Sequence, residues 1–117
     1  MEYAEYGEET GTLGVKVVSA TETDERDHDE ESIEHIALVE FEFTNKTGYG
    51  IELHSSDFNA IDTEGFQGKA FSSQSGKVTG ELWVDIPKDG KAKACFRYEV
   101  GTPGPYSVQV GEVVVEQ

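Results

Sequence analysis

Large apolar and polar residues alternate most regularly in the stretch ALVEFEFTNKTGYG at 37–50. One valine and two phenylalanines take every second position, with glutamate or threonine between them, until Asn45 ends the pattern. A period of two with one apolar set is typical of a strand that buries one face, and the Lys-Thr-Gly-Tyr-Gly run that follows favours a turn. This segment is the best specified strand of the chain.

A second alternating strand, KAKACFRYEV, spans 91–100 and follows a Pro-Lys-Asp-Gly turn. Shorter β patterns complete the chain, and no segment has a helical apolar repeat of useful length. Besides the strand at 33–45 that contains the first stretch, these patterns fall at 12–20, 51–54, 58–60, 66–71, 81–86 and 106–110, with 113–115 as an extension of the last. About seven to eight short strands, with turns every eight to twelve residues, predict an all-β, immunoglobulin-like sandwich of two antiparallel sheets.

The alternation also predicts the core and several pairings. We expect the apolar set of the two best strands to lie inside, with Cys95, Arg97 and Glu99 facing outward. The predicted core set is Val39, Phe41, Phe43, Phe96, Tyr98 and Val100. Strand 12–20 is expected at a sheet edge, paired with 33–45, and strand 91–100 is expected to pair with 106–110. Residues 58–71 are expected to form a hairpin that turns at 62–65.

Polar segments predict the domain organisation. Residues 1–11 are expected to form a flexible tether, and 12–117 to form one sandwich domain, since this length supports a single core. The run TETDERDHDEES at 21–32 has no apolar side chain and is expected to be a mobile loop. The Ser/Gly-rich residues 72–76 are expected to form a second flexible connection.

Charge narrows the function classes. The chain carries 24 acidic and 9 basic residues, a formal net charge of −15, and this field repels the phosphates of nucleic acids. The hydrophobic fraction of 36% is high enough for a folded core, so the charge lies on a folded body. Such a charge is screened in molar salt, which favours a halophilic source.

The composition also bears on location. No stretch approaches the ~20 apolar residues of a membrane span, so we expect no direct membrane insertion. The first residues lack the charged and apolar regions of a signal peptide. Two explanations remain open: a cytoplasmic protein, or an exported one whose signal or lipid-anchored cysteine has been removed. The polar tether favours the second.

Four segments, in order, carry a resemblance to a known family: VEFEFTNKTG, SSDFNAIDTEG, IPKDGKAKACFRYEV and a closing strand. Together they resemble the immunoglobulin-like domain of unknown function 4352, found in secreted and lipid-anchored proteins of bacteria and archaea. The likeness covers about residues 12–116, and the acidic insert at 21–32 departs from it. It implies a sandwich and an envelope location, here of a halophilic archaeon, and it brings no catalytic residues.

Metal sites are weakly supported. His28, His35, His54 and Cys95 could suggest copper, but no histidine follows the cysteine and the one methionine is Met1, so the spacing fails. Asp24, Asp27 and Asp29 are weak calcium candidates in the acidic loop, without the central glycine and terminal glutamate of an EF-hand. A solvated loop is the competing interpretation. We expect no cofactor.

Other candidate sites lie at turns. Asn45-Lys46-Thr47 is a glycosylation sequon, although the asparagine is also suited to the turn itself. Tyr49 and Tyr106 are candidate partner-binding residues on glycine- and proline-containing loops, unless their rings fold back onto the core.

No catalytic residue can be named, because no nucleophile, base and orienting group occur in a recognisable pattern. The sequence therefore predicts a non-catalytic extracellular or cell-envelope binding module of a halophile, with a protein or cell-surface partner. A cytoplasmic accessory domain, or an enzyme without an identifiable active site, is the alternative.

Overall fold

The computed structural model describes residues 3–8, 11–71, 73–74, 77–110 and 113–115. These residues form ten β-strands and one turn of 3-10 helix, η1 (Ser55–Asp57). The strands are β1 (Tyr3–Glu8), β2 (Gly11–Thr23), β3 (His35–Lys46), β4 (Ile51–His54), β5 (Phe58–Ile61), β6 (Lys69–Ala70), β7 (Trp83–Ile86), β8 (Lys91–Val100), β9 (Ser107–Val110) and β10 (Val113–Val115). None of this helical structure has the length and apolarity of a membrane span.

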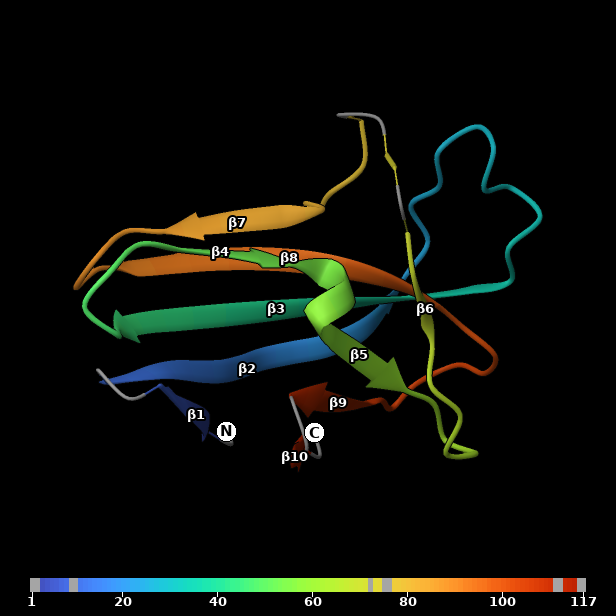
Figure 1. Cartoon of the computed structure of the whole chain (residues 1–117). Coiled ribbons are helices and arrows are strands. Elements are labelled where there is room, and N and C mark those ends of the chain that lie inside the picture. Colours follow the sequence, from blue (N-terminus) through green and yellow to red (C-terminus); the bar gives the residue numbers. More distant parts are fainter. Residues whose placement is uncertain (1–2, 9–10, 72, 75–76, 111–112, 116–117) are drawn as a thin grey trace.

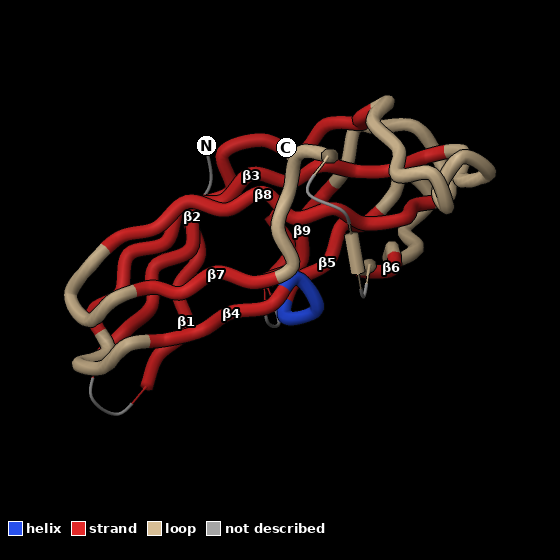
Figure 2. The backbone as a smooth tube through the Cα atoms, turned by 90° about the horizontal axis from the view of Figure 1, so that it is seen from above, coloured by secondary structure: helices blue, strands red, loops and turns tan. Residues whose placement is uncertain are grey.

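All strand pairs are antiparallel, and they build two layers (Figure 1). One layer is a five-stranded sheet in the order β1-β2-β3-β8-β6. The other contains the three-stranded sheet β10-β9-β5 and the pair β4-β7, which face β2, β3 and β8 across the core (Figure 2). The predicted all-β sandwich is confirmed. It has more strands than the seven or eight predicted, partly because β1 adds a strand in the segment interpreted as a tether.

Aromatic rings from both layers fill the core. The Phe41 ring has its centroid 5.5 Å from that of Phe43 and 5.6 Å from that of Phe96. Phe58, from the opposite layer, approaches the Phe41 centroid to 4.9 Å. All six residues of the predicted core set are buried. The period-two pattern therefore identified the inward face of β3 and β8 correctly.

The first strands differ from the prediction. Tyr3–Glu8 of the expected tether pair with 11–16 as β1, while residues 1–2 and 9–10 lie outside the described residues. This places β2 between β1 and β3, whereas the sequence suggested that β2 would be an edge strand. An edge strand has unpaired backbone groups, so even a polar segment can pair with it.

The predicted pairing of 91–100 with 106–110 is wrong. β8 pairs with β3 and β6, and β9 pairs with β5 and β10 in the other layer. The proline- and glycine-containing connection 101–106 crosses between layers, because both strands have apolar faces that must meet across one core.

The predicted hairpin at 58–71 is shorter than expected. Asp62 makes the turn by accepting the backbone amides of Glu64 and Phe66. One bridge, Ile61 to Gln67, follows, and β6 then pairs with β8. The expected flexible connection at 72–76 lies largely outside the described residues.

Two arginines hold the acidic segment that was predicted to be a free loop. Arg26 closes its base by donating to the carbonyls of Thr23, Ile33 and Glu34 at 2.8, 3.1 and 3.1 Å. Arg97 was expected to face outward to solvent, but it is 1% exposed because the segment covers it. Its guanidinium donates to both carboxylate oxygens of Glu30, at 2.6 and 3.3 Å.

Candidate functional site

Four of the chain's seven lysines lie on the outer face of β2, β3 and β8. The inward face of these strands is the core, so their alternate residues point away from it. The register places Lys16 opposite Glu42 and Glu42 opposite Lys93, and in the next row it places Thr44 opposite Lys91. Lys46 ends β3 on the same face. We call Lys16, Lys46, Lys91 and Lys93 the lysine face.

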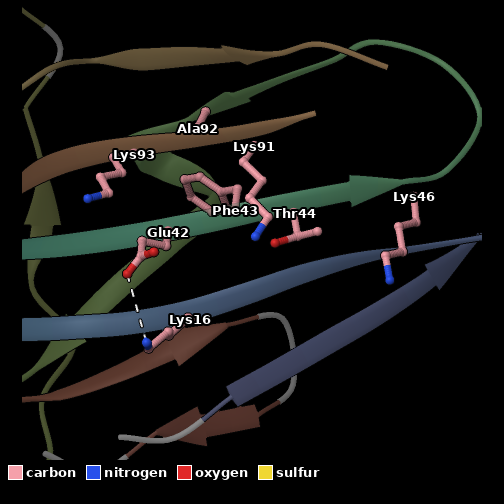
Figure 3. Close-up of a pocket in the computed structure, with 8 residues that line it drawn as sticks. All are labelled: Lys16, Glu42, Phe43, Thr44, Lys46, Lys91, Ala92 and Lys93. Atoms are coloured by element: carbon pink, nitrogen blue, oxygen red, sulfur yellow. Dashed lines mark ion pairs between the residues drawn. The ribbon is translucent and has the colours of Figure 1, made fainter. Parts of the chain in front are cut away.

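The lysine face surrounds an open hollow of about 690 Å³ (Figure 3). Lys16 contacts Glu42, with 3.9 Å between the ammonium nitrogen and a carboxylate oxygen. Both side chains of this pair are about 40% exposed, so the contact is weak. The ammonium groups of the other three lysines have no ion pair or hydrogen bond with any described residue.

This arrangement can bind an oxyanion. Each ammonium offers three donors, and the Thr44 hydroxyl lies among them, while one carboxylate, Glu42, is present to oppose an anion. The backbone strands fix the positions of the four lysine Cα atoms. The chemistry available is therefore hydrogen bonding and charge neutralisation of a ligand with carboxylate, sulfate or phosphate groups.

Sequence reasoning missed the lysine face. The outward positions of β3 and β8 were correctly predicted, but the direct pairing of these two strands was not. Without that pairing, Lys91 and Lys93 could not be placed beside Glu42 and Thr44. The available signal was compositional, since Lys16, Lys91 and Lys93 take outward positions of predicted strands in a chain that has only seven lysines.

Asn45 is a structural residue. It is 0% exposed, and its amide nitrogen donates to the carbonyls of Tyr49, Ile86 and Pro87. Its side-chain oxygen accepts the amide and the hydroxyl of Thr47. The nitrogen that a glycan would occupy is thus used inside the fold. The geometry supports the conformational interpretation of the sequon over glycosylation.

The two candidate tyrosines have different surroundings. Tyr106 is 1% exposed and donates its hydroxyl to the Thr102 carbonyl at 2.9 Å, so it is a structural corner and the prediction of partner binding is wrong there. Burial, with the nearby charges of Glu22 and Asp62, raises the pKa of Tyr106 to about 12. Tyr49 is 49% exposed and borders a hollow of about 310 Å³ with Leu13 and Ile51.

The structure separates most of the metal candidates. Asp27 and Asp29 lie together with Glu30, not with Asp24, and their ligand atoms are within 4.8 Å of one another. Glu30 is already paired with Arg97, whose charge opposes a cation at this position. These carboxylates therefore serve the loop, and nothing else at this position points to a bound ion.

The histidines and the thiol considered for copper lie apart. His35 contacts Glu22 and His54 contacts Glu52, each with 2.8 Å between nitrogen and oxygen, while His28 lies in the acidic loop. Burial, with the charges of Glu40 and Glu81, raises the pKa of the Cys95 thiol. A raised pKa keeps the thiol protonated and weakly nucleophilic.

The comparisons show the fold and no family. No family model matches the chain, and no curated protein matches it. Among solved structures, it is similar to MPT63, a secreted protein from Mycobacterium tuberculosis, with a TM-score of 0.74 and 15% identity over 99% of this chain and 92% of that one. It is also similar to the yjhA protein from Bacillus subtilis, with a TM-score of 0.51 and 14% identity over 90% and 75% of the two chains.

Proposed function

We propose that this protein is a non-catalytic binding module that holds an anionic ligand on the lysine face. The observation that carries the proposal is the gathering of four lysines, three without a partner among the described residues, around one hollow of a chain with net charge −15. Unpaired lysines on one face of so acidic a protein are best explained by a ligand that they contact.

We propose further that the module works outside the cell or in the cell envelope of a halophile. The high net negative charge supports the halophilic source, and the likeness to a secreted sandwich over nearly all of both chains supports export. In 1 M salt the Debye length is about 3 Å, so only direct contact with the ammonium groups would hold an anion. The hollow permits such contact. Membership of the 4352 family remains a proposal.

The alternative is a cytoplasmic accessory domain. Immunodetection of the native protein in envelope, medium and cytoplasmic fractions of the source cells decides between the locations. An exported protein should be recovered in the same fraction as an envelope or medium marker protein. Recovery with the cytoplasmic marker protein would contradict export.

A titration tests the anion site itself. Sodium pyrophosphate is added to the isotopically labelled protein, and backbone amide shifts are followed by NMR, with sodium chloride at matched ionic strength as the reference. We expect saturable shifts centred on Glu42, Thr44, Lys91 and Lys93. These residues form adjacent rows of the same sheet face.

The matched variants are Lys91→Gln/Lys93→Gln and Lys69→Gln/Lys88→Gln, which change the net charge equally. The first should lose saturable binding, whereas the second should keep it. An equal loss of pyrophosphate binding in both variants, or chemical-shift changes that sodium chloride reproduces, would contradict the proposed anion site.

A further inference from the structure

The β4–β7 pair presents an exposed tryptophan on the side of the sandwich opposite the lysine face. Leu53 of β4 and Ile86 of β7 point into the core. Their neighbours along each strand therefore point outward. Trp83 is 53% exposed, a large fraction for a side chain with so much apolar surface. His54 lies directly across from it in the strand register.

Two carboxylates share this outer surface. Glu52 and Asp85 are directly opposite each other in the register, where like charges destabilise a strand pair. Glu52 contacts His54, with 2.8 Å between nitrogen and oxygen, whereas the carboxylate of Asp85 has no hydrogen bond or ion pair with a described residue. No lysine or arginine lies among the outward residues of the pair. We call Glu52, His54, Trp83 and Asp85 the tryptophan platform.

The platform is suited to an ammonium group with an apolar stem. An indole face attracts cations, best when water is excluded, and carboxylates beside it accept the ammonium donors. The methylene stem of a lysine can lie along the ring while its charge reaches a carboxylate. The chemistry of the platform therefore calls for a partner that presents several lysines.

The chain itself presents such a partner surface. Figure 2 shows β4–β7 and β2–β3–β8 in different layers, and the tryptophan platform and the lysine face are the outward sides of these two layers. We propose that the lysine face of one copy docks on the tryptophan platform of another, with Lys91 and Lys93 toward Asp85 and Trp83. This inference rests on the proposed function, because it names the carboxylates of a second copy as the anion that the lysine face receives.

The docking joins two different surfaces, so a docked pair keeps one lysine face free on one copy and one tryptophan platform free on the other. Contacts of this heterologous kind form rings if the rotation closes and open chains if it does not. Repulsion between copies of net charge −15 opposes the contact in dilute buffer, and salt screens this repulsion. Self-association is therefore expected to strengthen as salt rises from dilute toward molar concentration.

Complementary charge reversals test the pairing. Sedimentation equilibrium of the full chain at several protein and salt concentrations measures the average mass. Wild type should exceed the monomer mass at high concentration. Lys91→Glu/Lys93→Glu and Glu52→Lys/Asp85→Lys should each remain monomeric alone, because each has lost one surface. Mixed together, they should associate again, since each supplies the surface that the other retains and the two reversed surfaces are also opposite in charge.

Two controls address charge and folding. Lys69→Glu/Lys88→Glu has the same net charge as the first variant and should still associate. Circular dichroism melts establish that each variant is folded, and Trp83→Ala should weaken wild-type association without reversing any charge.

Three outcomes would overturn the inference: wild type that is monomeric at every salt concentration, mixed variants that do not associate, or capture of an oligolysine peptide by Trp83 without self-association. A monomer that still binds pyrophosphate on the lysine face would overturn the docking and leave the proposed function standing.

Discussion

Phe41 is the most direct residue-scale test of the core, because its ring contacts rings from both layers. It is 0% exposed, and truncation would leave a cavity that these rings fill only in part. Phe41→Ala is expected to lower the free energy of unfolding by about 3 to 5 kcal/mol. Urea denaturation followed by circular dichroism measures it. Phe66→Ala is the matched control, since Phe66 is 68% exposed and its loss should change stability by less than about 0.5 kcal/mol.

Single residues also show what could and could not be predicted from the sequence. Alternation identified Phe41 and Phe96 as inward, because one strand defines its own two faces. It could not find the use of Asn45, whose amide contacts the carbonyls of Ile86 and Pro87, about forty residues away. The same limit applies to Arg97, which occupies an outward position and is buried by a distant loop.

At the scale of elements, one ion pair fastens the acidic segment to the sheet. Burial raises the pKa of Glu30, but the hydrogen bond from Arg97, the Asp27 amide and the Arg97 charge lower it, and the net result lies below the ordinary value of 4.5. A carboxylate with a lowered pKa stabilises the fold above its unfolded pKa. That contribution is lost as the pH falls through the folded pKa.

Glu30→Gln tests this contribution. At pH 7 the variant should be about 3 kcal/mol less stable than wild type, because it leaves the buried Arg97 charge unpaired. The gap should begin to narrow as the pH falls below the ordinary glutamate pKa of 4.5, and it should close only below the lowered pKa of Glu30, where this carboxyl is neutral in the folded protein too. Urea denaturation at a series of pH values measures the gap. A stability difference that does not change with pH would contradict the role of Glu30. The control is Glu31→Gln: Glu31 is exposed in the same segment, so this variant should have almost the same stability as wild type at every pH.

The strand pairings show why architecture was easier to predict than topology. The pairing of β2 with β3 joins neighbouring strands, and it was expected from their matching lengths. The pairing of β3 with β8 joins strands separated by about half of the chain, and no local pattern specifies it. The pairing of β3 with β8 brings the residues of the lysine face together. The candidate site therefore could not be predicted, although its strands were.

For the whole molecule, the net charge predicts a salt response. Carboxylates repel one another most in dilute buffer, so the melting temperature should rise as KCl increases from dilute to molar. Thermal melts at low protein concentration measure this without self-association. A triple variant, Asp24→Asn/Asp29→Asn/Glu31→Gln, should show a smaller rise because it carries fewer exposed charges. A melting temperature that is flat or falls with KCl would contradict the halophilic source.

If the lysine face is a binding surface, its amines are covered in the native setting, and amine labelling measures this. Intact source cells and the purified protein are treated with the same acylating reagent, and modified lysines are identified by mass spectrometry. We expect Lys91 and Lys93 to be labelled less in cells than in the purified monomer, and Lys69 and Lys88 to react equally in both. Equal labelling of all four lysines in cells and in the purified protein would contradict it.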